Sequence, residues 1–155
     1  MQPGVMQAVL VREVGGYEHT ELPVPEPGAG EALIRVSVTG LCRTDLKVIR
    51  HGHRDLTLPR VPGEEVVGAV VALGPEGAAA PAHRVAVGDR VYVYPGVWCG
   101  ECPSCRRGAE NLCRKMRIMG FHRDGGFAEY VAAPLQSLSQ CPTGSAMKRP
   151  CSLNR

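Results

Sequence analysis

The chain has 155 residues with a net charge of +3, and 44% of its residues are hydrophobic. This length is enough for one ordinary domain with a hydrophobic core, and the weak, scattered positive charge argues against nucleic acid as a partner. The N-terminal residues contain no long apolar run. We therefore expect neither a signal peptide nor a membrane span, and hence reduced thiols in the cytoplasm.

Short strands joined by tight turns are expected, because the chain contains 19 glycine and 13 proline residues. Residues 6–12 predict a first strand, and residues 17–22 predict its hairpin partner. The proline-rich stretch 23–30 can form neither a helix nor a central strand. Residues 31–40 alternate apolar and polar side chains, and this period of two predicts a half-buried strand. Its apolar face would contain Ala32, Ile34, Val36 and Val38.

A helix is predicted next, over residues 41–51, with Thr44 or Asp45 as its cap. Residues 61–74 form the most apolar run, and two glycines interrupt it, which predicts a buried strand bent at glycine. Further strands are expected at residues 88–94 and 120–132. Many short strands with one or two brief helices are typical of a partly open β-barrel, and so we expect a mainly β fold.

Four closely spaced cysteines stand out in the second half of the chain. Cys99, Cys102, Cys105 and Cys113 follow the pattern C-x2-C-x2-C-x7-C. Four thiolates complete the tetrahedral shell of Zn²⁺ and leave no position for water or substrate, which is typical of a structural rather than a catalytic site. We expect a zinc-binding lobe over residues 96–117.

Two other interpretations of these cysteines remain open. The first is an iron–sulfur cluster, because C-x2-C-x2-C also begins the bacterial ferredoxin pattern. That pattern continues with three residues, a cysteine and a proline, whereas here seven residues intervene and Arg114 follows the last cysteine. The second is a pair of disulfides.

Several motifs occur together in a specific order: GLCRTD at 40–45, PGEEVVG at 62–68, VGDRVYV at 87–93, the four cysteines, and GGFAEYV at 125–131. On these motifs the chain resembles, from Gln7 to Ser139, the N-terminal GroES-like catalytic domain of the medium-chain zinc-dependent alcohol dehydrogenases. The resemblance implies a GroES-like barrel with a zinc lobe. It also implies an enzyme that oxidises an alcohol or polyol with NAD(P).

The resemblance also implies roles for individual residues. Cys42 matches the first ligand of a catalytic zinc, and Thr44 matches a hydroxyl that relays the alcohol proton, because a hydroxyl can donate and accept at once. Asp45 matches a carboxylate beside the metal ligands. Arg43 matches a basic residue that contacts the cofactor phosphates, and Glu65 matches an acidic neighbour of the zinc.

One position departs from the family pattern, which is usually G-H-E-x-x-G over residues 63–68. Glu64 stands where the family has its histidine ligand. A carboxylate can bind zinc, but its negative charge would weaken the metal as a Lewis acid. His51, His53 and His83 are alternative ligands, although each is better explained as a surface histidine.

The second departure concerns the C-terminal part. The family places a dinucleotide-binding half with a G-x-G-x-x-G motif after this domain, and the sequence contains no such motif. We expect a domain over residues 1–139 and an atypical tail over 140–155. Codons can be chosen so that another reading frame of this tail encodes VPDGLSDEEAVLLEP, which resembles the family's continuation. A frameshift that truncates a longer gene is therefore one hypothesis.

The leading functional hypothesis is a fragment of a zinc-dependent NAD(P) alcohol or polyol dehydrogenase, inactive alone. Its structural zinc would lie at the four cysteines and its catalytic zinc near Cys42, Glu64 and Glu65. Its partners would be an alcohol or polyol substrate and further copies of the chain, with no nucleic acid and no membrane. The alternatives are a non-catalytic zinc-stabilised β-barrel that acts in binding or assembly, and an iron–sulfur electron carrier.

Overall fold

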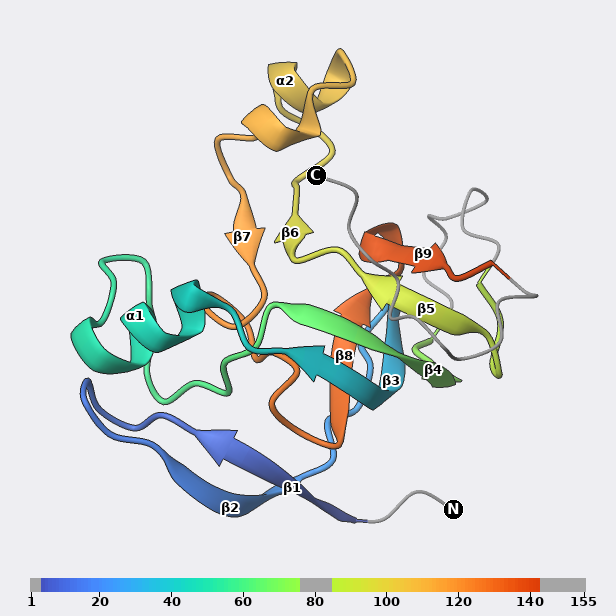
Figure 1. Ribbon diagram of the computed structural model, residues 1–155. Coiled ribbons are helices and arrows are strands. Elements are labelled where there is room, and N and C mark those ends of the chain that lie inside the picture. Colours follow the sequence, from blue (N-terminus) through green and yellow to red (C-terminus); the bar gives the residue numbers. More distant parts are fainter. Residues whose placement is uncertain (1–3, 76–84, 143–155) are drawn as a thin grey trace.

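The computed structural model describes residues 4–75 and 85–142, and it consists mainly of short antiparallel strands (Figure 1). One sheet has five strands in the order β8–β3–β4–β5–β9. These strands are β3 (Glu31–Gly40), β4 (Glu65–Leu73), β5 (Arg90–Val93), β8 (Tyr130–Pro134) and β9 (Leu138–Gln140). The mainly β fold expected from the sequence is confirmed. The described residues contain no parallel sheet flanked by helices.

A hairpin lies below this sheet in Figure 1 and is formed by β1 (Val5–Leu10) and β2 (Glu18–Pro23), as predicted. Backbone hydrogen bonds attach it to the chain that leads into β8. Val9 N donates to Phe127 O at 2.8 Å, and Glu129 N donates to Gln7 O at 3.1 Å. The predicted strand over 120–132 is therefore realised only from residue 130 onward, because the preceding residues cross to the hairpin.

The remaining elements are short. They are helix α1 (Arg43–His51), strands β6 (Gly96–Val97) and β7 (Arg117–Ile118), helix α2 (Pro103–Arg106), and the 3-10 turns η1 (Glu110–Leu112) and η2 (Leu135–Ser137). Among the described residues, no helix is long and apolar enough to cross a bilayer. Gln140 pairs with Val91, and Cys141 N donates to Arg90 O at 2.8 Å. Residues 143–155 of the expected tail lie outside the described residues.

The hydrophobic core is formed mainly by side chains from the strands of the large sheet, and it is rich in valine. It comprises Ala32, Ile34, Val66, Val70, Val91, Val93, Met119, Val131, Ala133 and Leu138. The alternation predicted for residues 31–40 is interrupted. Leu33 is buried as well as Ile34, while Val38 is 50% exposed. The register of β3 against β4 shifts between Leu33 and Ile34 and again between Val36 and Val38. The first shift adds Val71 on β4, and the second adds Ser37 on β3, which turns Val38 away from the face that Val36 occupies.

The cap of α1 also differs from the prediction. Neither Thr44 nor Asp45 occupies the cap position, which is held by Cys42. Thr44 N donates to Cys42 Sγ at 3.4 Å, and Cys42 N donates to Asp45 Oδ2 at 2.8 Å. This is the reciprocal arrangement of a capping box, with a thiol in place of the usual hydroxyl. The acidic residue therefore supports the cap from inside the first turn of the helix.

Strand β4 begins at Glu65, four residues later than predicted, and one of the two glycines of the predicted strand, Gly68, lies within it. A Cβ at Gly68 would overlap the backbone carbonyl oxygen of Arg35 on β3. A backbone neighbour cannot rotate away, so only glycine allows this close approach of the two strands.

We predict that Gly68→Ala lowers the free energy of unfolding by about 1–3 kcal/mol, because the added methyl group must push β3 away from β4. Urea denaturation followed by circular dichroism measures this change. The matched control is Gly16→Ala, because a Cβ there meets nothing closer than Glu13 Cγ at 3.9 Å. The control should change stability by less than about 0.5 kcal/mol. Equal stabilities for the two variants would contradict the close approach.

An ion pair joins the start of β3 to the loop before β8. Arg123 Nη2 donates to Glu31 Oε1, and Gly28 N donates to Glu31 Oε2 at 3.0 Å. Burial alone would raise the pKa of Glu31, but these hydrogen bonds outweigh burial and hold its pKa below the ordinary value of 4.5. The folded state thus prefers the ionised carboxylate. Its contribution to stability is present above pH 4.5 and is lost as the pH falls through the lowered pKa.

Glu31→Gln should therefore destabilise the chain by about 1 kcal/mol at pH 7, after allowance for solvent screening. The difference from the parent chain should shrink as the pH falls below 4.5 and through the lowered pKa of Glu31, because the parent carboxyl then becomes protonated as well. Thermal unfolding at several pH values tests this. Glu26→Gln removes one charge from an exposed position and serves as the control. A destabilisation that does not change with pH would rule out the charge of Glu31 as its cause.

Candidate metal centre and catalytic site

The lobe predicted from the cysteines stands away from the large sheet on a two-stranded stalk (Figure 1). Strands β6 and β7 form this stalk, and Gly96 pairs with Ile118 and Val97 with Arg117. Helix α2 and turn η1 form the tip. The stalk brings the two ends of the cysteine-bearing segment together, so that Cys99 and Cys113 meet although 13 residues separate them.

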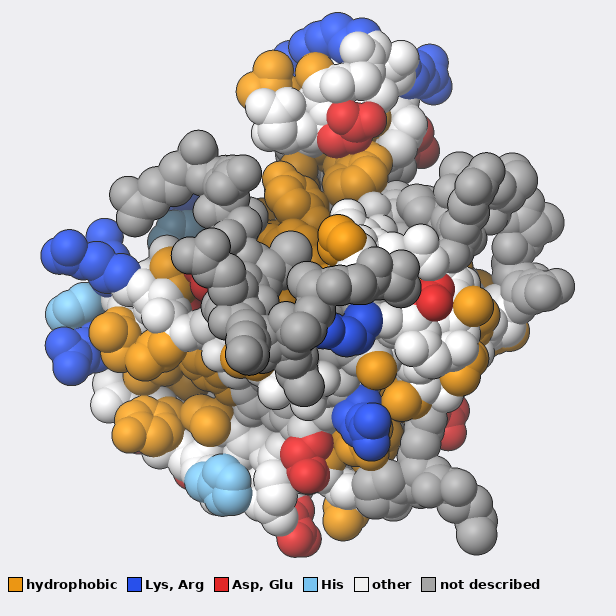
Figure 2. Space-filling model, turned by 45° about the vertical axis from the view of Figure 1, so that its right-hand side comes forward, with side chains coloured by type: hydrophobic (Ala, Val, Ile, Leu, Met, Phe, Trp, Pro, Cys, Tyr) orange, Lys and Arg blue, Asp and Glu red, His pale blue; other side chains and the backbone are white. Residues whose placement is uncertain are grey.

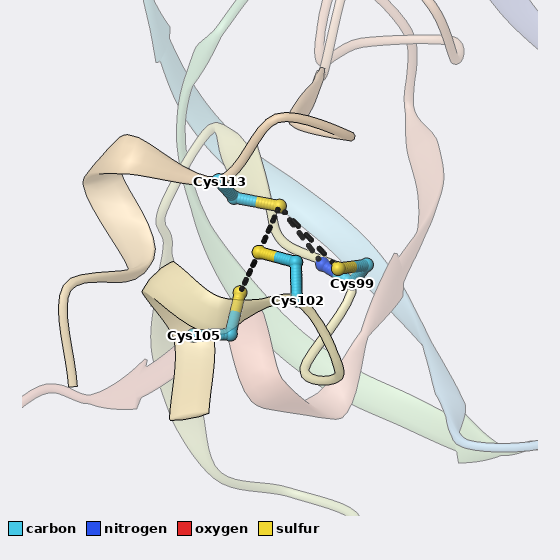
Figure 3. Close-up of side chains that lie close together, drawn as sticks. All are labelled: Cys99, Cys102, Cys105 and Cys113. Atoms are coloured by element: carbon cyan, nitrogen blue, oxygen red, sulfur yellow. Dashed lines mark hydrogen bonds between the residues drawn. The ribbon is translucent and has the colours of Figure 1, made fainter. Parts of the chain in front are cut away.

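The four cysteine side chains converge at the centre of the lobe, as Figure 3 shows. The Sγ distances are 3.5 Å from Cys102 to Cys105, 3.9 Å from Cys102 to Cys113, and 3.6 Å from Cys113 to Cys99. All four sulfurs lie within 4.8 Å of one another. A tetrahedron with zinc–sulfur bonds of about 2.3 Å has edges of about 3.8 Å. Disulfides have S–S distances of about 2.05 Å. The sulfurs are therefore spaced for a tetrahedral metal and not for disulfides.

The electrostatic environment of the four thiols is uneven. The backbone N–H of Glu101, and then that of Cys102, lowers the pKa of Cys99. The backbone N–H of Cys105 lowers the pKa of Cys102 to about 6, whereas burial and the neighbouring Cys102 raise the pKa of Cys105 to about 12. Since a metal ligates thiolates, its binding must displace protons from this cluster, and its affinity must weaken as the pH falls.

A second group of polar side chains lies where β3 meets α1. Cys42 Sγ donates to Thr44 Oγ1 at 3.5 Å. The Glu64 carboxyl lies beside them, since the side chains of Cys42 and Thr44 both act to lower its pKa against the larger opposing effect of burial. A thiol, a hydroxyl and a carboxyl from two motifs about twenty residues apart thus contact one another.

Asp45 fixes the geometry of this corner. Its side chain is 3% exposed. One carboxylate oxygen accepts from Cys42 N, and the other accepts from Gly63 N at 3.1 Å. Burial raises the pKa of Asp45, and burial followed by the charge of Asp45 raises the pKa of Glu64. The carboxylate therefore ties the backbone before Cys42 to the backbone before Glu64.

The other sequence-predicted site residues lie around this corner. Glu65 begins β4, and its charge acts on both Asp45 and Glu64. Arg43 is exposed in the first turn of α1. His51 and His53 are exposed, and His53 Nδ1 accepts from Asp55 N at 3.2 Å. His83 lies outside the described residues.

The number of side chains that could bind a metal differs between the lobe and the corner at Cys42. Within residues 4–75 and 85–142, only the four cysteines form a group of three or more side chains that could hold an ion. Cys42 and Glu64 together offer two ligands, whereas a catalytic zinc takes three from the protein. A cavity of about 440 Å³ lies elsewhere, between the hairpin and β8, and none of the candidate site residues lines it.

A family model described as the alcohol dehydrogenase GroES-like domain matches residues 28–143. The chain belongs to this family. L-threonine 3-dehydrogenase of Pyrococcus horikoshii is 38% identical, over 88% of this chain and 39% of the relative. D-altritol 5-dehydrogenase of Agrobacterium fabrum is 40% identical, over 81% of this chain and 36% of the relative. The chain thus spans about two fifths of the length of these family members.

Solved structures of family members have the same fold as this chain. A cobalt- and zinc-bound thermostable alcohol dehydrogenase from Pyrobaculum aerophilum superposes with a TM-score of 0.81 and 32% identity, over 93% of this chain and 43% of that chain. An alcohol dehydrogenase from Escherichia coli complexed with NADH gives a TM-score of 0.80 and 33% identity, over 93% of this chain and 40% of that chain. The described fold is thus the one that these family members share.

If the four sulfurs hold zinc, Cys105→Ser should lose the ion and lower the melting temperature by at least about 5 °C, because the metal contributes directly to local folding. Elemental analysis and calorimetry measure the two effects. Cys42→Ser is the matched control, because it removes a thiol outside the lobe and should leave the lobe metal in place. Unchanged metal content in Cys105→Ser would contradict this assignment.

Proposed function

We propose that this chain is the GroES-like part of a zinc-dependent dehydrogenase. The enzyme would oxidise an alcohol or polyol to a carbonyl compound by hydride transfer to NAD(P), or catalyse the reverse reaction. The observation that carries the proposal is the contact among Cys42, Thr44 and Glu64 at the β3–α1 corner. The names of the relatives support it, since L-threonine and D-altritol both carry the secondary alcohols that such enzymes oxidise.

Each residue of this corner would have a separate role in the proposed reaction. The Thr44 hydroxyl would accept the proton of the substrate alcohol and pass it on, because it can accept one hydrogen bond while donating another. Asp45 would act as a positioning residue through its bonds to the two backbone N–H groups. Arg43, exposed in the first turn of α1, would face the phosphates of the cofactor.

The metals would have separate roles. Four sulfurs saturate a tetrahedral zinc, so the lobe ion would be structural. A catalytic zinc, which supplies a Lewis acid for the substrate oxygen, would rest on Cys42 with Glu64 or Glu65 and needs a ligand from beyond the described residues. None of the cysteines at the corner or in the lobe forms a disulfide, which agrees with a reducing, cytoplasmic location. We also propose that the chain forms homo-oligomers.

One observation favours a second candidate, a non-catalytic zinc-stabilised barrel that acts in binding or assembly. Glu64 replaces the histidine of the family pattern, and the described residues supply only a pair of ligands at the corner. Under this alternative the lobe would retain its zinc while Thr44 would have no chemical role. The two candidates therefore differ in what Thr44→Val changes.

The test joins this chain to the dinucleotide-binding half of the D-altritol 5-dehydrogenase and measures NAD(P) reduction with a panel of alcohols and polyols. We expect turnover, and we expect Thr44→Val to lower kcat by roughly 100-fold, because proton transfer by a positioned group contributes about 10²–10⁴-fold. Thr20→Val, on β2 of the hairpin, is the matched control. A chimera that folds and binds NADH, but whose turnover is absent or insensitive to Thr44→Val, would favour the non-catalytic barrel.

A further inference from the structure

A second cleft lies where the lobe meets the edge of the large sheet. Its volume is about 350 Å³, and the residues that line it include the aromatic Tyr92, Tyr94 and Trp98 and the polar Glu110 and Asn111. It shares no residue with the corner at Cys42. Figure 2 shows hydrophobic side chains gathered at this junction between the lobe and the body. The volume is within the range of small-molecule sites.

The aromatic wall is the most distinctive feature of the cleft. Three of the chain's seven aromatic residues line it, including its single tryptophan. Tyr94 and Trp98 pack edge to face, with ring centroids 6.3 Å apart and planes at 63°. Tyr94 remains 42% exposed. Such rings offer a flat apolar surface with a polar edge, onto which the apolar face of a ligand can stack.

One backbone hydrogen bond and one side-chain hydrogen bond hold this wall in place. Tyr94 N donates to Ser137 O at 2.7 Å, and Gln136 Nε2 donates to Trp98 O at 2.9 Å. A Cβ at Gly96 would lie only 2.6 Å from Tyr94 Cε1, so the ring packs directly over this glycine. The wall is therefore ordered before any ligand arrives, which reduces the entropic cost of binding.

Polar side chains also line the cleft. They include Glu110, Asn111 and Ser139, and within the described part of the chain no lysine, arginine or histidine lines it. These groups combine donors and acceptors. A purely apolar ligand would leave them unpaired, and an anion would be repelled by Glu110.

A cation is disfavoured as well, because the lobe over residues 96–117 carries more basic than acidic side chains. The basic ones are Arg106, Arg107, Arg114, Lys115 and Arg117, against Glu101 and Glu110. A neutral ligand with one apolar face and several hydroxyls suits both the aromatic and the polar residues of the cleft. We propose that this cleft binds a pyranose sugar, stacked on Tyr94 and Trp98 and hydrogen-bonded to Glu110, Asn111 and Ser139.

Trp98 provides the measurement, because it is the only tryptophan and its fluorescence reports on the cleft alone. We would titrate the zinc-loaded full chain with the methyl glycosides of glucose, galactose and mannose. At least one pyranoside should give a saturable change. Sorbitol, which has similar hydroxyls but no rigid ring, should bind at least about fivefold more weakly, because it must be ordered on binding.

Variants then test the aromatic and the polar residues of the cleft. Tyr94→Leu should weaken pyranoside binding about fivefold or more, Tyr94→Phe should retain it, and Tyr17→Leu, at an exposed tyrosine of the hairpin, is the matched control. Glu110→Gln should also weaken binding, whereas Glu26→Gln should not. Zinc content and circular dichroism establish that each variant is folded.

The proposal is overturned if no pyranoside gives a saturable signal, if Tyr94→Leu binds as the parent does, or if choline binds more tightly than every pyranoside. Cys42→Ser should leave the titration unchanged. Because methyl pyranosides are bound here without turnover, the result does not depend on whether the chain forms part of a dehydrogenase.

Discussion

The pairing of β3 with β4 is the constraint on which the candidate catalytic corner depends. Its register places Gly40 opposite Glu65, so the motif at 40–45 and the motif at 62–68 leave the sheet at the same edge. Asp45 then fixes their separation with one carboxylate oxygen on each backbone. A slip of one residue would turn alternate side chains to the other face and would separate Cys42 from Glu64.

The close contact at Gly68 protects this register. The glycine lies opposite Val36, where the pairing shifts, and its missing side chain lets the two backbones approach. Bulges of this kind twist a strand and change the direction of the residues that follow. The register shift at Val36 and the position of the polar corner thus depend on the same stretch of the β3–β4 pairing.

Regular patterns in the sequence predicted the longer elements well. The period of two over residues 31–40 gave the observed bounds of β3, and the hairpin and α1 were also predicted. Strands β6, β7 and β9 have two or three residues each, which is too few to show any period. The exposure of Val38 was missed because a bulge depends on the partner strand. The cap at Cys42 was missed because cysteine is not a usual cap, although Asp45 three residues later was a usable signal.

The candidate sites were predictable to the extent that their residues are close in sequence. The spacing of the four cysteines indicated that their sulfurs would meet, since three of them lie within seven residues. The pyranose cleft could not be foreseen, because Tyr94, Glu110 and Ser139 come from three separate elements. Only the packing of the lobe against the sheet brings them together.

The narrow stalk has a consequence for how the molecule is organised energetically. Only two residue pairs join β6 to β7, and the lobe beyond them has the four sulfurs at its centre rather than a share of the valine core. Parts of a protein with few apolar contacts open independently of the rest. We therefore expect the lobe to be the first part of the chain to open when a metal held by the four sulfurs is lost, and this early opening lowers the temperature at which unfolding begins.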